Sequence, residues 1–486
     1  MNLYLIGHAF DYETEKVVKL FLPETPITRL HEAPADDGDR IETRRIPETG
    51  GCVFVCFAQL DGRTARRTRR LDGEPDDKAC ELTIGALLYG VLAELTGYEP
   101  PWGILTGVRP TKLMRSLVET LGQEGAVRRF RDVDLVTPEK TRLALSVAQR
   151  QQPVVLSNGK MSCSVYVSIP FCPTRCSYCS FVSHSIEQAG KLIPDYVELL
   201  CGEIASTGAI IRALGLVCES VYIGGGTPTT LTAPQLTRIA RALRGALDFG
   251  QVREFTVEAG RPDTLDREKL EALRDAGVSR ISINPQTFSD AVLTRIGRRH
   301  SVADTIEMYE LARSLGFDNI NMDLIAGLPG DSREGHLDSV RRAIGLAPEN
   351  ITVHTLTRKR ASRIVTSRED YERAADMART LDDGANLLDK AGYGPYYLYR
   401  QTGSLGNLEN VGYAKPGFDC LYNIYMMEEL HTVLACGAGA VTRLKHWNEN
   451  LIERVYNFKY PYEYISRYPI VEQKKAQIAA FYEKYF

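Results

Sequence analysis

Six short β-rich runs alternate with helical stretches in the middle of the chain. The runs are rich in Val, Ile and Tyr, as buried strands are, and the stretches between them repeat apolar residues every three to four positions. The predicted strands are 163–170, 219–226, 252–259, 278–285, 318–327 and 350–357. The predicted helices include 192–208, 234–247, 264–277 and 303–316, several of which end in glycine, as helix C-caps often do.

This alternation predicts a parallel sheet with right-handed crossovers, and therefore an α/β fold. Six strand–helix units are two fewer than a closed eight-unit barrel contains. We therefore expect an open, partial (β/α)6 barrel over residues 162–364, with room on its inner face for a large ligand.

The two ends of the chain differ from this middle part. Residues 1–155 contain alternating runs typical of strands and one stretch with helical periodicity, which predicts an N-terminal α+β domain. The strand-like runs are 2–7 and 52–60, the helical stretch is 79–97, and a polar linker is predicted near 150–161. Residues 365–486 are more aromatic and less regular, and we expect them to form a C-terminal accessory domain that covers the substrate.

The composition is that of an ordinary globular protein. The 486 residues carry a formal net charge of −3, with 44% hydrophobic and 25% charged residues, which gives no reason to expect nucleic acid or a membrane as a partner. The apolar runs fall short of the ~20 residues that span a bilayer, and the first residues lack a basic signal-type region, so we expect a cytoplasmic protein. The basic run 64–71 is interpreted as a solvated strand or loop.

The eleven cysteines are mostly scattered, which indicates buried thiols and one possible metal site rather than disulfides. Cys172, Cys176 and Cys179 form a C-x3-C-x2-C cluster directly after the first predicted barrel strand. A zinc site with His184 is conceivable, but structural zinc normally uses two paired sets of ligands, and no second C-x2-C pair exists here. Chance clustering is a further alternative. A cubane iron–sulfur cluster held by three cysteines would leave one iron open, and the amino and carboxylate groups of S-adenosylmethionine (SAM) could chelate it.

The cysteine spacing resembles the signature of the radical SAM enzymes. The segment 224-GGGTPT-229, after the second predicted strand, resembles the motif that binds the SAM amino group, and its glycines would let the backbone approach a ligand. Further segments resemble the oxygen-independent coproporphyrinogen III dehydrogenase family: 165–172, 282–288, 297–300, 323–330, 412–416 and 437–440. The resemblance covers about residues 162–486, and 102-WGILTGVRPTK-112 resembles the N-terminal extension of one long subgroup.

The resemblance implies a set of site residues. The three cysteines would hold a [4Fe–4S] cluster, and SAM would take the fourth iron. The residues implied for the cofactor site are Tyr166, Tyr178, Gly225, Gly226, Thr227, Glu258, Gln286, Arg298 and Asp323. Among them, Glu258 would hold the amino acid part of SAM, Asp323 the ribose hydroxyls and Arg298 a carboxylate. The alternative role for Tyr178 is only to shield the cluster, and the alternative for Glu258 is a plain carboxylate at a strand end.

The resemblance also implies an activity. A SAM-derived 5′-deoxyadenosyl radical would start the oxidative decarboxylation of two coproporphyrinogen III propionates to vinyl groups, giving protoporphyrinogen IX in anaerobic heme biosynthesis. The implied partners are a tetrapyrrole substrate and a reducing electron donor of the flavodoxin or ferredoxin type. Arg298, Arg299 and Lys415 are candidates to pair with substrate carboxylates.

Two departures from the family pattern keep other functions open. The dehydrogenases usually have a fourth cysteine where this chain has Phe181, and a histidine where it has Ser168. Heme chaperones of the same superfamily share the phenylalanine, but they tend to carry a His-Asn pair where this chain has Tyr422 and Asn423. A radical SAM methyltransferase that opens the heme ring would share the fold as well.

Overall fold

The computed structural model describes residues 1–23, 25–32, 38–179, 183–357, 374–401 and 403–486, so Phe181 lies outside the described residues. The chain forms two compact units, which are described separately. The first comprises Met1–Gln149, Glu372–Asp382 and Tyr399–Glu409, and the second comprises Arg150–Tyr371, Asp383–Leu398 and Asn410–Phe486. The predicted division into an N-terminal domain (1–155), a partial barrel (162–364) and a C-terminal substrate-covering domain (365–486) stays a prediction.

The first unit contains, within its described residues, a five-stranded sheet in the order β2-β1-β3-β4-β5. The strands are β1 (Asn2–Ile6), β2 (Thr28–Leu30), β3 (Arg40–Glu48), β4 (Gly51–Leu60) and β5 (Arg63–Asp72). The helices are α1 (Asp11–Phe21), α2 (Asp77–Thr96), α3 (Pro110–Arg128) and most of α4 (Pro138–Ser157). The α+β prediction for this region is confirmed, and the basic run is the mostly exposed edge strand β5.

The helix α2 packs against α1, β4 and β5 in the core of this unit. Among the described helices it is the one whose length and apolar composition would suffice to cross a bilayer. More than half of its most apolar window is buried inside the protein, as expected for a core helix.

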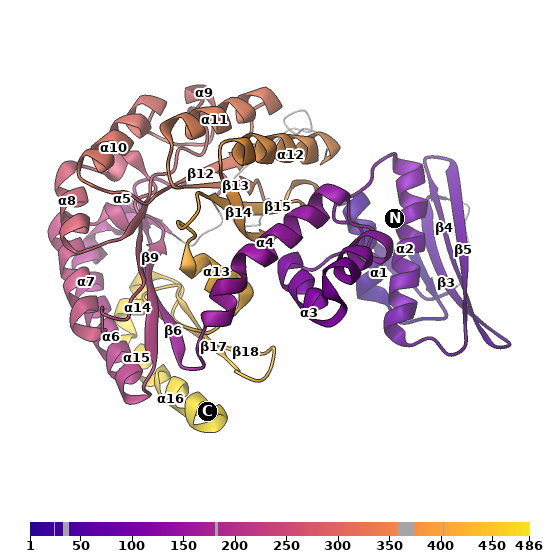
Figure 1. Ribbon diagram of the computed structural model, residues 1–486, viewed down its shortest axis with the longest axis horizontal. Helices are drawn as coiled ribbons and strands as arrows, with labels where there is room; N and C mark the ends of the chain where they lie inside the picture. Colours follow the sequence, from indigo (N-terminus) through magenta and orange to yellow (C-terminus); the bar gives the residue numbers. More distant parts are fainter. Residues whose placement is uncertain (24, 33–37, 180–182, 358–373, 402) are drawn as a thin grey trace. The chain divides into compact units, whose positions relative to one another are not determined.

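The second unit contains the predicted partial barrel (Figure 1). Its six parallel strands are β6 (Ser162–Ile169), β9 (Val217–Gly225), β10 (Glu254–Glu258), β11 (Arg280–Ser282), β12 (Ile320–Ala326) and β13 (Asn350–Thr355). Helices form an outer layer along the sheet: α6 (Ile193–Ala213), α7 (Ala233–Ala246), α8 (Arg267–Asp275), α10 (Val302–Ser314) and α11 (Arg333–Leu346). The six predicted strands and the four predicted helices are all present, so the predicted fold class is confirmed.

Later strands extend this sheet at both edges. Over the described residues its order is β14-β15-β13-β12-β11-β10-β9-β6-β16-β17-β18. The added strands are β14 (Gly394–Arg400), β15 (Glu409–Ala414), β16 (Thr432–Cys436), β17 (Val441–Lys445) and β18 (Ile452–Tyr456). The connecting helix α13 (Leu421–Glu428) and the C-terminal helices α14 (Pro461–Ser466), α15 (Tyr468–Lys474) and α16 (Ala476–Tyr485) complete this part. Much of the aromatic C-terminal stretch therefore belongs to the barrel sheet itself.

The structure corrects two local predictions. A polar linker was predicted near 150–161, but α4 continues to Ser157. The prediction is therefore wrong for residues 150–157. Tertiary contacts hold this end of α4: Arg150 donates to the Asp419 carboxylate at 2.6 Å, and Gln151 donates to the Tyr396 carbonyl at 3.0 Å. The helix predicted to end at residue 208 continues to Ala213, and Gly208 is needed there because a Cβ would clash with the Ala246 carbonyl oxygen.

A buried ion cluster connects distant parts of the first unit. The Lys140 ammonium lies 2.5 Å from a Glu409 carboxylate oxygen and 2.7 Å from an Asp382 oxygen. The other Glu409 oxygen accepts a hydrogen bond of 2.7 Å from the Trp102 indole. Lys140 and Glu409 are both almost completely buried, so each charge depends on the other for its stability.

We expect Lys140→Met to lower the free energy of unfolding of this unit by about 3–5 kcal/mol, because Glu409 would remain buried without its cation. The measurement is urea unfolding followed by the fluorescence of Trp102, which is 1% exposed, whereas the other tryptophan, Trp447, is 40% exposed. Arg142→Gln is the control, since it breaks only the solvent-exposed pair with Glu139 and should cost less than about 1 kcal/mol. Equal losses from the two substitutions would contradict this account.

Candidate active site

The three predicted cluster cysteines lie on one loop at the carboxyl edge of the sheet. The loop follows β6 and begins with the short strand β7 (Phe171–Cys172). Cys172 and Cys176 are buried, and Cys179 is half-buried. Across the described ranges, no three His, Cys, Asp or Glu side chains are gathered closely enough to hold a metal ion, so the ligand set stays a prediction.

The glycine-rich loop after β9 is hydrogen-bonded to the cysteine loop. The Gly226 N–H donates to the Ile169 carbonyl, and the Thr227 N–H donates to the Phe171 carbonyl, both at 2.7 Å. The Thr227 hydroxyl also donates to the Cys172 sulfur at 3.4 Å. A Cβ at position 226 would lie 2.5 Å from the Phe171 oxygen and 3.0 Å from the Cys172 sulfur. This glycine is therefore required by the close approach of the two loops.

Glu258 is the last residue of β10, as the sequence predicted. One of its carboxylate oxygens accepts a hydrogen bond of 2.7 Å from the Tyr222 hydroxyl. A Cβ at Gly224 would lie 3.0 Å from the same carboxyl group. Burial raises the pKa of Glu258 to about 7, although the hydrogen bond from Tyr222 acts in the opposite direction. A cationic group bound beside this carboxyl would favour its charged form.

Asp323 lies on β12, where two amide side chains orient its carboxylate. Asn284 donates to one oxygen and Asn321 to the other, each at 2.8 Å. Burial alone would raise the pKa of Asp323, but contacts with His354 and Asn321 hold it below the ordinary value. The carboxylate is therefore ionised and held in one orientation.

Gln286 lies beside Asp323 in an unusual backbone conformation. Its φ of 68° is in the left-handed region that side chains other than glycine rarely adopt. Two backbone hydrogen bonds to β12 hold it there, from the Gln286 N–H to the Asp323 carbonyl and from the Ile325 N–H to the Gln286 carbonyl, both at 2.9 Å. Strain held in this way is typical of functional sites.

Arg298 contacts the cysteine loop through Tyr178. Its guanidinium donates to the Tyr178 hydroxyl at 2.9 Å and to the Gly260 carbonyl at 3.2 Å. Its hydrogen bonds within the described part of the chain end on neutral oxygens, so the guanidinium remains suited to an anionic ligand.

Three tyrosines stack beside Glu258. The rings of Tyr222 and Tyr422 are 4.4 Å apart and 23° from parallel, and Tyr166 lies 6.2 Å and 6.1 Å from these two rings. Tyr166 is a predicted site residue, whereas Tyr222 was not predicted. Its position on β9 two residues before Gly224 could have indicated it, because alternate strand residues share one face of a sheet.

Lys415 does not reach this site, and that part of the carboxylate-pairing hypothesis is wrong. β15 runs antiparallel to β13, and Ala414 pairs with Asn350, the first residue of β13. Lys415 therefore follows at the amino edge of the sheet, where it donates to the Ala347 carbonyl at 2.7 Å. Arg299 is well exposed and donates to Glu187 at 3.2 Å.

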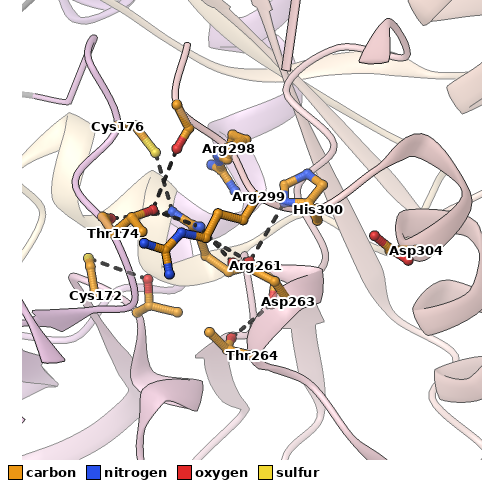
Figure 2. A network of polar contacts seen from close by, with 12 residues as sticks. Cys172, Thr174, Cys176, Arg261, Asp263, Thr264, Arg298, Arg299, His300 and Asp304 are labelled. Carbon is orange, nitrogen blue, oxygen red and sulfur yellow. Dashed lines mark hydrogen bonds and ion pairs between the residues drawn. The ribbon is translucent and has the colours of Figure 1, made fainter. Parts of the chain in front are cut away.

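A polar network that was not predicted from the sequence surrounds Cys176 (Figure 2). Arg261, three residues after the end of β10, donates to the Cys176 sulfur at 3.4 Å and forms an ion pair with Asp263. His300 lies on the other side of Asp263, with its Nδ1 3.7 Å from an Asp263 oxygen. Arg261 could have been predicted as a site residue, because charged residues just beyond the carboxyl ends of barrel strands are often functional.

The arrangement fits a cluster and a small zwitterionic ligand. Cys172 and Cys176 each receive a hydrogen bond, from a hydroxyl and a guanidinium, as charged sulfur ligands require. The glycines keep side chains away from the space between the two loops and Glu258. Carboxylate and guanidinium groups on neighbouring strand ends provide both signs of charge.

The model of the radical SAM superfamily matches residues 166–343. The chain is 38% identical over 484 residues to the oxygen-independent coproporphyrinogen-III oxidase-like protein HemZ of Bacillus subtilis (strain 168), which covers 97% of this chain and 96% of that protein. It is also 34% identical over 284 residues to the heme chaperone HemW of Escherichia coli (strain K12), which covers 57% of this chain and 70% of that protein.

Among solved structures, coproporphyrinogen III oxidase HemN from Escherichia coli superimposes on this chain with a TM-score of 0.53 at 22% identity. The superposition covers 67% of this chain and 73% of that chain, and it shows that the two proteins share a fold. The fold and site thus define a radical SAM protein, whose cofactors are a [4Fe–4S] cluster and SAM. Within that class, the chain belongs to the family of oxygen-independent coproporphyrinogen-III oxidase-like proteins.

We expect Gly226→Ala to weaken retention of the cluster about 10- to 100-fold, because the added Cβ would push the two loops apart at Cys172. The measurement is iron content and visible absorbance after anaerobic reconstitution and gel filtration. Gly245→Ala on α7 is the matched control, since a Cβ there meets no atom of the described residues within 4 Å. Wild-type iron content in Gly226→Ala would show that the close approach of the loops is not required.

Proposed function

We propose that the protein oxidatively decarboxylates coproporphyrinogen III to protoporphyrinogen IX. Each of two propionate side chains loses carbon dioxide, a proton and two electrons and becomes a vinyl group, and the proton and both electrons would be taken up in the conversion of one SAM to methionine and 5′-deoxyadenosine. The similarity to a coproporphyrinogen-III oxidase-like protein over 97% of the chain supports this proposal, whereas the similarity to a heme chaperone covers 57%.

The position of Tyr422 is the structural observation that favours the enzyme over a heme chaperone. The resemblance implies that this tyrosine stands where the chaperones tend to carry the histidine of their His-Asn pair. Tyr422 is 5% exposed, and its ring stacks on Tyr222 beside Glu258. The residue forms part of the wall of the site, and its ring is packed against other tyrosines, so the Tyr422 hydroxyl is not presented to a heme iron at the surface.

In this proposal Cys172, Cys176 and Cys179 hold the cluster. When bound, the cluster and SAM together supply a reducing electron and a radical that can remove hydrogen from an unactivated carbon. The residues assigned to the SAM site are Tyr166, Tyr178, Gly225, Gly226, Thr227, Glu258, Gln286, Arg298 and Asp323.

The side chains of this site bind and orient charged groups. The Glu258 carboxylate pairs with the amino group of SAM, and Arg298 binds a carboxylate. The fixed orientation of Asp323 suits two neighbouring ribose hydroxyls. The tyrosine stack excludes water, which protects a reactive site from side reactions. An electron donor of the flavodoxin or ferredoxin type and a cytoplasmic location are further parts of this proposal.

The test is anaerobic turnover by the reconstituted protein with SAM, a reductant and coproporphyrinogen III. We expect protoporphyrinogen IX and carbon dioxide to form together with 5′-deoxyadenosine, as measured by mass spectrometry. Cys176→Ala should form none of these products. The same preparation is titrated with heme. One tightly bound heme per chain without turnover would contradict the proposal and favour the chaperone, and a methylated linear tetrapyrrole would favour the ring-opening methyltransferase.

We expect SAM affinity to fall with decreasing pH, because only the ionised carboxyl of Glu258 pairs with an ammonium group. The pKa of Glu258 is raised to about 7, so the dissociation constant should rise up to about tenfold for each pH unit below that value. Equilibrium dialysis of labelled SAM with the oxidised holoprotein measures this. Glu258→Gln should bind weakly with a flat profile, whereas Glu198→Gln, which removes an exposed carboxylate on α6, should behave as wild type. An unchanged pH profile in Glu258→Gln would exclude this role.

A further inference from the structure

Arg261 is a buried arginine held in one conformation at the cysteine loop. It is 4% exposed and lies after the end of β10. Its backbone carbonyl accepts hydrogen bonds from the Thr264 N–H at 2.9 Å and the Thr264 hydroxyl at 2.8 Å. The Thr264 hydroxyl is in turn 2.7 Å from the Thr229 hydroxyl, which follows the glycine loop. Both the backbone and the side chain of Arg261 are therefore fixed.

The guanidinium of Arg261 contacts the cysteine loop at three atoms. Its Nη1 donates to the Cys176 sulfur and to the Thr174 carbonyl, both at 3.4 Å. Its Nη2 donates to the Thr174 hydroxyl at 3.1 Å. Figure 2 shows Arg261 between these two loop residues and Asp263. One side chain thus holds the middle of the loop and also places a positive charge against a predicted cluster ligand.

Asp263 holds the guanidinium in place. Its two carboxylate oxygens accept hydrogen bonds from Arg261 Nε at 2.9 Å and Nη2 at 2.7 Å. Burial alone would raise the pKa of Asp263, but contacts with His300 and Arg261 keep it well below the ordinary value. His300 is 3% exposed, and burial lowers its pKa, so it is a neutral neighbour near pH 7. Arg261 and Asp263 therefore present to Cys176 one cation with one anion behind it, and the buried Arg298 guanidinium is a second cation that interacts with this sulfur.

We propose that Arg261 is a positioning residue for the iron–sulfur cluster and raises its reduction potential. A hydrogen bond and a positive charge at a thiolate ligand stabilise the reduced cluster, which carries one more negative charge than the oxidised one. Asp263 sets the size of this effect, because it orients the guanidinium and partly balances its charge. This inference depends on the cluster and not on the tetrapyrrole substrate.

Because Arg261 and Asp263 carry opposite charges, removing one or the other should shift the midpoint potential of the cluster in opposite directions. In Arg261→Gln the cation is lost and the anion remains, so the midpoint potential of the cluster should become more negative. In Asp263→Asn the cation loses its counter-charge, so the potential should become more positive. A purely structural clamp predicts weaker cluster retention in both variants, without opposite shifts in potential.

The experiment is an EPR-monitored redox titration of the reconstituted full-length protein without SAM, together with the rate of iron release to a chelator. We expect the two opposite potential shifts, and iron release from Arg261→Gln about 10- to 100-fold faster than from the wild type. Arg261→Lys should recover part of the potential while iron release stays fast, because the charge returns without the two-pronged contact to Thr174 and Asp263.

Two further variants keep the test decisive. Arg253 precedes β10, at the end of this strand opposite to Arg261, and pairs with Glu219 at 3.0 Å. The control variant Arg253→Gln should therefore leave the cluster potential and the rate of iron release unchanged. Thr174→Val leaves Arg261 and Cys176 intact and should speed iron release with little change in potential. The proposal would be overturned by a wild-type potential in Arg261→Gln, or by shifts of the same sign in Arg261→Gln and Asp263→Asn. If Arg261→Gln retains no cluster, the sign of the shift in Asp263→Asn decides alone.

Discussion

Two backbone hydrogen bonds, from Gly226 to Ile169 and from Thr227 to Phe171, join the glycine loop to the cysteine loop. The register of β6 and β9 makes these bonds possible, because it pairs Ile169 with Gly225 directly beneath them. From β7 to Cys179, where its described part ends, the cysteine loop has little regular structure of its own. The sheet therefore fixes the start of the loop, and the rest of the site is built around that fixed point.

The other strands of the barrel bring their polar residues to the same edge. Parallel strands all end on one side, so Glu258, Gln286 and Asp323 meet although long helices separate them in the sequence. β16 adds to this edge from the C-terminal region, and the Ser168 hydroxyl donates to the Ala438 carbonyl at 2.8 Å. Ser168, a departure from the family pattern, thus fastens the later strand to the first one.

Local patterns in the sequence were sufficient for the six strands, the cysteine loop, the glycine loop and Glu258. Each of these depends on residues close together in the chain. The contact between Arg261 and Thr174 joins positions 87 apart, and that between Tyr222 and Tyr422 joins two different strand–helix regions, so no local pattern indicated them. The position of Lys415 depends on the direction of β15, which the sequence alone does not specify. Hence the position of these residues at strand ends was predictable from the sequence, and the residues that contact them from distant parts of the chain were not.

The buried Lys140 has a further consequence for how the protein is made. Its counter-ion Glu409 lies 269 positions later in the chain. A ribosome adds about 5–20 residues per second, so the interval between the two residues is on the order of tens of seconds. Throughout that interval the N-terminal unit has a lysine that it cannot bury without cost. The emerging N-terminal unit therefore cannot complete its buried ion cluster until Glu409 has been made, by which time most of the barrel sequence has already been synthesised.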